Sequence, residues 1–251
     1  MTMAEPHALS DSTRIGSEGL TGIARTAGLF YLGLAVTGAL GYQIVRGQLY
    51  VVDNAGATLS NLVEHTGTAR LGIVLELSIV LTQALTAAWF YRLFRSVESF
   101  AAGLIAAFGM VNAVAILGSA ALLATALDVA DDKSLAVTGG AAATAQLLYV
   151  ISGHLWGVGG LFFGLWLIPM GWLVVRSAWM PRLLGQLLIL GGAGYVLSTF
   201  VSYVFANAGL AVGLLTVPAT IGELWIVGYL IFVGVREHPR PDRQSRRPAA
   251  T

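Results

Sequence analysis

The chain has 251 residues, of which 56% are hydrophobic and only 11% are charged, and its net charge is +1. A soluble domain carries about 25% charged residues. This composition, with a mean hydropathy of +0.76, therefore indicates a protein whose partner is the lipid bilayer, and it argues against a nucleic-acid partner. The absence of cysteine excludes disulfides, thiolate metal ligands and cysteine nucleophiles.

Six apolar segments are long enough to cross a bilayer, where a helix needs about 20 predominantly apolar residues. The sequence therefore predicts an all-α polytopic membrane helix bundle with six transmembrane helices. A polar N-terminal tail over 1–23 precedes it, and a basic, disordered tail over 236–251 follows it. Pro169 and Pro218 fall inside the fourth and sixth spans, where proline predicts a kink. The predicted spans cover residues 24–45, 70–91, 100–127, 149–175, 181–205 and 210–235.

Two of the connections between spans have a predicted structure. Residues 55–65 place Leu59, Leu62 and Val63 on one helical face, which predicts a short interfacial helix, with an ordered polar loop as the alternative. The turn before the fifth span is polar, and Pro181 stands there at the expected first position of the next helix. The fourth and fifth spans therefore form a predicted transmembrane hairpin.

The distribution of Lys and Arg predicts the orientation, because cytoplasmic connections carry an excess of both residues. One side of the predicted topology holds eleven of them and the other side holds three. Both termini are therefore expected in the cytoplasm, and an even number of spans requires them to share one side. The eleven are Arg14, Arg25, Arg92, Arg95, Arg176, Arg182, Arg236, Arg240, Arg243, Arg246 and Arg247, and the three are Arg46, Arg70 and Lys133.

Few polar side chains lie inside the spans, and ionisable groups there are costly enough to be candidates for function. Our hypothesis is a polar cavity that opens outward and is lined by Glu76, His154 and Glu223. The alternative is structural: Glu76 and His154 bond to one another or to Arg70 and hold the bundle together. The candidate ligand-binding residues are Glu76, Gln83, Asn112, His154 and Glu223, to which Ser198, Thr199, Ser202 and Tyr203 would add hydroxyl groups.

Motifs for bound groups are missing from the sequence. One histidine and two glutamates have the composition of a metal site, but no spacing of the HExxH type supports one, so we expect no metal. No phosphate-binding loop, dinucleotide fingerprint or serine-nucleophile elbow occurs, and we expect no cofactor. Four glycines at helical spacing in the fourth span predict close helix packing instead, namely Gly153, Gly157, Gly160 and Gly164.

The segment 154–185, with its Phe-Phe-Gly-Leu and Arg-Ser-x-x-x-Pro-Arg motifs, resembles a bacterial membrane family known as domain of unknown function 4386. The stretches 25–31, 70–72 and 217–223 support the resemblance, which covers nearly everything from residue 25 to residue 235. It implies a multipass protein of the bacterial cytoplasmic (inner) membrane and no established activity. In that family a histidine often follows the Phe-Phe-Gly-Leu motif, and here Trp166 stands in that place.

Three functions are open for such a protein. The leading hypothesis is a sensor or accessory protein that binds a small-molecule or lipid ligand in the outward-facing cavity. The second is a membrane-embedded enzyme acting on an isoprenoid or other lipid, with Glu76 or Glu223 as general acid. The third is a small transporter working as a homodimer, because six helices are few for a secondary transporter acting alone.

Overall fold

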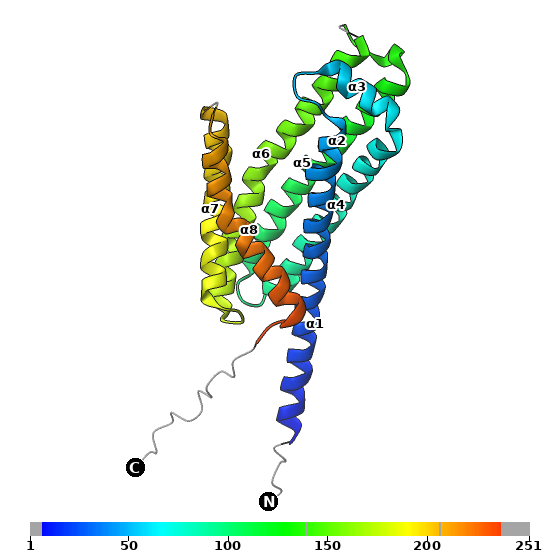
Figure 1. Cartoon of the computed structure of the whole chain (residues 1–251). Helices are drawn as coiled ribbons and strands as arrows, with labels where there is room; N and C mark the ends of the chain where they lie inside the picture. The colour runs from blue at the N-terminus through cyan, green and yellow to red at the C-terminus, as the bar shows by residue number, and fades with distance from the viewer. Residues whose placement is uncertain (1–6, 139, 206, 237–251) are drawn as a thin grey trace, which may run out of the picture.

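The computed structural model describes residues 7–138, 140–205 and 207–236, with side chains from residue 19 onward. These residues form long helices that lie side by side in a bundle (Figure 1). The start of α1 and the end of α8 lie at one end of the bundle, and α3 lies at the other. The helical segments in chain order are α1 (His7–Gly38), η1 (Ala39–Val45), α2 (Arg46–Leu49), α3 (Ala55–Glu64), α4 (Thr66–Phe94), α5 (Ser99–Asp131), η2 (Lys133–Leu135), α6 (Gly140–Ser177), α7 (Arg182–Val204) and α8 (Gly209–Phe232).

Six helical segments of the described chain are long and apolar enough to cross a membrane, which confirms the predicted all-α, six-span bundle. Only 22% of the most apolar stretch of α7, and 22% of that of α8, is buried inside the bundle. The remaining apolar surface needs a hydrocarbon solvent, as expected for a multipass membrane protein. The six segments are Gly19–Leu49, Thr66–Phe94, Ser99–Asp131, Gly140–Ser177, Arg182–Val204 and Gly209–Phe232.

The helix ends differ from the predicted spans in three places. Helix α1 begins at His7, inside the segment predicted as a polar tail, and α6 runs from Gly140 to Ser177 without interruption. Pro181 was predicted as the first residue of the fifth helix, but α7 begins one residue later, at Arg182. The predicted bounds are those of the apolar segments, whereas a helix continues as long as its backbone hydrogen bonds are satisfied. Of the predicted basic tail, only Arg236 lies within the described residues.

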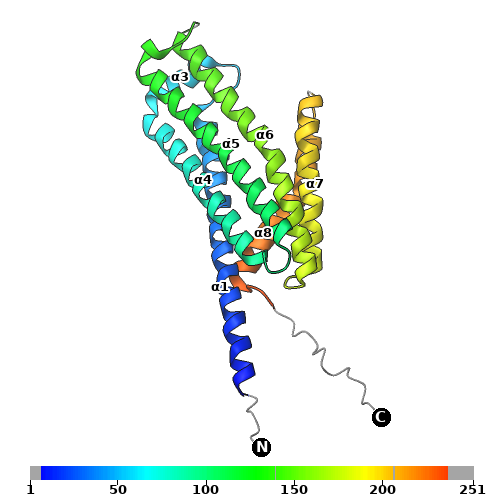
Figure 2. The same cartoon turned by 180° about the vertical axis from the view of Figure 1, so that it is seen from behind.

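The predicted short helix after the first span is present as α3, and Asn54 caps it by accepting a hydrogen bond from the Ala57 N–H at 3.0 Å. Of its predicted apolar face, Leu62 is buried and Val63 is 51% exposed. Thr58 is buried, and its hydroxyl is bonded to Val51. Helix α3 packs on the ends of α5 and α6 (Figure 2).

The buried apolar side chains form two clusters. The larger one joins α1, α4, α5, α6, α7 and α8 and includes Tyr31, Phe90 and Trp166. The smaller one lies towards α3 and joins η1, α2, α3, α4, α5 and α6 around Leu49 and Tyr149. The candidate site described below is enclosed by this smaller cluster.

Helices α6 and α7 approach each other through glycines, as predicted for the fourth span. A Cβ added at Gly164 would lie 2.8 Å from the Gly192 carbonyl oxygen, and one at Gly185 would lie 2.6 Å from the Gly171 carbonyl oxygen. Such distances leave no room for a side chain, so the two backbones are in direct contact. Gly153, the first glycine of the predicted stripe, lies instead against the Arg46 guanidinium.

Candidate functional site

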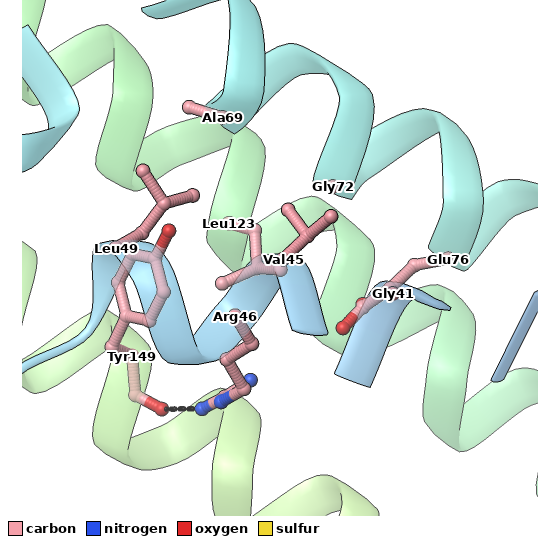
Figure 3. Close-up of a pocket in the computed structure, with 9 residues that line it drawn as sticks. All are labelled: Gly41, Val45, Arg46, Leu49, Ala69, Gly72, Glu76, Leu123 and Tyr149. Carbon is pink, nitrogen blue, oxygen red and sulfur yellow. Dashed lines mark hydrogen bonds between the residues drawn. The ribbon is translucent and has the colours of Figure 1, made fainter. Parts of the chain in front are cut away.

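A small cavity lies between the end of the first span and α4, α5 and α6 (Figure 3). Its volume is about 10 Å³, which is close to the minimum for one water molecule. Arg46, Glu76 and Tyr149 are its polar residues, and we refer to it as the Arg46–Glu76 cavity. Its lining consists of Gly41, Val45, Arg46, Leu49, Ala69, Gly72, Glu76, Leu123 and Tyr149.

The backbone of the first span changes form next to this cavity. Residues Ala39–Val45 are a π-helix, and the Arg46 N–H bonds to the Gly41 carbonyl oxygen five residues back. Pi-helical turns are rare, and those that occur are frequently found at functional sites. Gly41 allows the turn to lie close to α4, because a Cβ there would lie 3.1 Å from Leu75 Cβ.

Arg46 is held by α6 and by three tyrosine rings. Its Nη1 donates to the Ser152 hydroxyl at 2.8 Å, and its Nη2 donates to the Tyr149 carbonyl oxygen at 2.5 Å (Figure 3). The rings of Tyr42, Tyr50 and Tyr149 lie 5.4, 5.7 and 5.4 Å from its guanidinium carbon. Cation–π contacts and charged hydrogen bonds together fix the guanidinium beside the cavity.

Glu76 brings an incompletely bonded carboxyl group to the same cavity. The side chain is 2% exposed, and its Oε1 accepts a hydrogen bond from the Trp156 indole nitrogen at 3.1 Å. Its Oε2 is buried and makes no hydrogen bond of normal geometry among the described residues, although the Ser119 hydroxyl lies near enough to act on this carboxyl group. An unsatisfied buried acceptor costs about 1–3 kcal/mol, and more if it is charged, so this atom is the strongest signal for a bound group in the cavity.

Gln83 and Asn112 lie further along α4 and α5 and bond to one another. The Asn112 amide donates to Gln83 Oε1 at 3.4 Å, and both side chains are buried. The Gln83 amide nitrogen has no partner among the described residues. This pair joins α4 to α5 and does not line the Arg46–Glu76 cavity.

The three residues that we expected in one cavity have different neighbours. His154 is exposed, and its Nδ1 lies 3.1 Å from the Tyr203 hydroxyl of α7. Glu223 accepts a hydrogen bond from the Tyr31 hydroxyl of α1. Neither lines the Arg46–Glu76 cavity. The suggested bond between Glu76 and His154 is also absent from the described residues, since Trp156 and Tyr203 are their partners.

The hydroxyl groups expected from α7 are used locally. Ser198 and Thr199 bond to the Tyr195 carbonyl oxygen, and Ser202 bonds to the Thr199 carbonyl oxygen. Only the fourth of them, Tyr203, reaches another helix, at His154. Among the described residues, no group of three or more His, Asp or Glu side chains is placed to hold a metal ion.

Sequence reasoning missed the residues that complete the site. Arg46 counted there only as a charge in a connection, and Ser119, Tyr149 and Ser152 were not candidates. The Ser119 and Ser152 hydroxyls lie 2.7 Å apart, so they link the Arg46 guanidinium to α5. The available signal was tyrosine residues near Arg46. Tyr42 and Tyr50 are close to it in the sequence, whereas the third tyrosine of the site is close to it only in space.

The family model described as "Domain of unknown function (DUF4386)" matches residues 26–234 of the chain. The match covers the first span from residue 26 onward, the five other spans and every residue of the Arg46–Glu76 cavity. No curated protein and no solved structure matches the chain.

Proposed function

The chain belongs to the DUF4386 family, and we propose that this multipass membrane protein binds a small or lipidic ligand through a polar head group in the Arg46–Glu76 cavity. The observation that carries the proposal is the unpartnered Oε2 of Glu76, a buried acceptor on the wall of a cavity. A ligand with a hydrogen-bond donor would satisfy this atom.

The shape and chemistry of the cavity favour a hydroxyl head group. The volume of about 10 Å³ accommodates a group the size of water. A hydroxyl donates one hydrogen bond and accepts others, so it suits a site with a carboxylate on one wall and a guanidinium on another. A carboxylate head group would be repelled by Glu76, and an ammonium head group by Arg46.

The rest of such a ligand is expected to be apolar. Six of the nine lining residues are glycine, alanine, valine or leucine. Ile44 and Leu71, on the two helices that flank the cavity, are 51% and 50% exposed. An alkyl chain leaving the cavity would therefore meet the same apolar environment as these side chains. The proposed ligand is an amphipathic alcohol.

Thermal unfolding of the purified full chain in detergent tests this function, because a bound ligand raises the melting temperature. The probes are 1-decanol and decyl methyl ether, which have the same alkyl chain but differ in the hydroxyl hydrogen. We expect 1-decanol to raise the melting temperature of the wild type relative to the ether. Glu76→Leu should abolish that difference, and Glu64→Gln, on the exposed surface of α3, should retain it.

A second variant keeps the test valid if Glu76→Leu does not fold. Ala69→Val adds two methyl groups to the cavity wall and leaves the carboxyl group in place. It should also abolish the difference between the alcohol and the ether. An alcohol-specific shift of equal size in the wild type, Glu76→Leu and Ala69→Val would contradict the proposed function.

We further propose that this cavity lies towards the outer face of the bacterial inner membrane. The excess of Lys and Arg on the other side supports this orientation. Since the chain has no cysteine, single variants can be labelled on intact cells with a membrane-impermeant maleimide. Lys133→Cys, between α5 and α6, should react, and Ser96→Cys, between α4 and α5, should not. The reverse pattern would place the cavity on the cytoplasmic side.

A further inference from the structure

A second carboxyl group within the spans, that of Glu223, lies outside the Arg46–Glu76 cavity, and Glu223 is the only charged residue of α8. Its Oε1 accepts the Tyr31 hydroxyl of α1, and Tyr31 is itself 2% exposed. Glu223 keeps part of its surface accessible. A carboxylate within a membrane span is strongly unfavourable unless something compensates its charge, so what faces Glu223 determines its role.

The described neighbours of Glu223 supply a hydrogen bond but no opposite charge. Its interactions are the Tyr31 hydroxyl and the apolar surroundings. Two arginines of the described residues have other partners: Arg46 is bonded to Ser152 and Tyr149, and Arg176 lies over Trp172. A neutral phenol cannot compensate a full negative charge.

Tyrosines from two other helices lie beside this carboxyl group, and two further rings connect them to one another. The Tyr31 ring lies 5.4 Å from that of Trp166 on α6, which lies 5.6 Å from that of Phe163. The Phe163 ring lies 5.3 Å from that of Tyr195 on α7, whose phenol is close enough to Glu223 for a direct electrostatic interaction. These four rings form a continuous arc that begins and ends beside Glu223, and we call it the aromatic arc.

Part of the surface of Glu223 and of two of the rings is accessible. Helix α8 packs on α1 and α7, and α7 packs on α6, so α1 and α6 are bridged here by the rings. Phe163 and Tyr195 are half-buried, like Glu223 itself.

We propose that Glu223 and the aromatic arc form a binding site for a lipophilic monovalent organic cation, such as a quaternary ammonium or phosphonium ion. The cation would supply the opposite charge that Glu223 lacks, and aromatic faces attract such cations. Metal cations fit poorly, because Ca²⁺ requires six to eight oxygen ligands and Mg²⁺ retains tightly held waters. The apolar substituents of the organic cation match the rings.

This site is independent of the proposed alcohol site. The two share no residue, and each has its own glutamate: Glu76 of α4 lines the cavity near α3, and Glu223 of α8 faces the aromatic arc. Each glutamate therefore serves as the control for the other, and failure of one proposal leaves the other intact.

The experiment measures equilibrium binding of tetraphenylphosphonium to the purified full chain in detergent by isothermal titration calorimetry. Triphenylphosphine oxide serves as a neutral compound of similar shape. We expect saturable binding of the cation to the wild type and none of the neutral compound. Glu223→Gln should weaken the binding at least about tenfold, whereas Glu76→Gln should leave it unchanged.

A second variant removes an aromatic face and keeps the charge. Tyr195→Leu should weaken binding about threefold to tenfold, and it remains informative if Glu223→Gln does not fold. Equal affinity of the cation for the wild type, Glu223→Gln and Tyr195→Leu would overturn the proposal. So would the absence of saturable binding to the wild type, or binding of the neutral compound with the same affinity.

Discussion

The indole N–H of Trp156 donates to one oxygen of Glu76 at 3.1 Å, while the other oxygen of the same carboxyl group is buried without a partner. Trp156→Phe would leave both oxygens unsatisfied. We expect this change to lower the free energy of unfolding by about 1–3 kcal/mol. Thermal or chemical unfolding in detergent measures it. Trp172→Phe, at an exposed position, is the control and should cost less.

The same pair can be tested by a double-mutant cycle. In a Glu76→Leu background the indole has no carboxyl group to satisfy, so Trp156→Phe should cost less than it does in the wild type. Additive effects of the two substitutions would show that the hydrogen bond contributes no stability.

Arg46 should not tolerate replacement by lysine. The guanidinium contacts the Ser152 hydroxyl and the Tyr149 carbonyl oxygen at the same time and lies against three rings. A single ammonium group cannot reproduce that planar arrangement. We expect Arg46→Lys to cost about 1–3 kcal/mol of stability, whereas Arg70→Lys, on the exposed side of α4, should be nearly neutral. The melting temperatures of the two variants decide the point.

Gly171 should be irreplaceable where α6 meets α7. A Cβ there would lie 2.8 Å from the Ile189 backbone nitrogen, so Gly171→Ala must push the helices apart. The expected cost is about 1–3 kcal/mol. Gly213 of α8 has nothing within 4 Å of an added Cβ, and Gly213→Ala should be neutral or slightly stabilising. Similar melting temperatures for both variants would contradict the close approach of α6 and α7.

The carboxyl group of Glu98 caps α5 outside the spans and should make stability depend on pH. The Ala101 and Phe100 N–H groups donate to it at 2.6 and 3.0 Å, which lowers its pKa below the usual 4.5. Its contribution is therefore fully present above pH 4.5 and disappears as the pH falls through the lowered pKa. Glu98→Gln should melt below the wild type at neutral pH, and this difference should shrink in acid. A difference that is independent of pH would contradict the capping role.

The spans were predictable because the bilayer sets the length of an apolar helix, and this requirement is written directly in the order of residues. The ends of the helices were less predictable. The residues of α1 before position 24 are polar, yet they continue the helix, because helix formation there does not depend on hydropathy. Pro181 was predicted as the first residue of its helix but is the residue before it, because a proline suits both the cap and the first turn.

The site was predictable only in part. Glu76, Gln83 and Asn112 stood out as polar residues in apolar segments, and all three are buried in the bundle. Their partners depend on how each helix is rotated about its axis, which hydropathy does not determine when apolar residues cover all sides. Arg46 escaped notice because the predicted first span ended at residue 45, whereas the helical segment continues through α2 to Leu49.

The π-helix of residues Ala39–Val45 also has a consequence for the spacing of the first span. Each turn of a π-helix holds about one residue more than an α-helical turn. Deleting one residue from it would allow an ordinary α-helix and leave the span long enough for the bilayer. Because an ordinary turn would replace the wider one, the side chains after the deletion would keep nearly their present direction about the helix axis. A shortened chain of this kind would still insert into the membrane with its guanidinium towards α6, whereas deleting one residue from the α-helical part of α1 would turn the following side chains by about 100°.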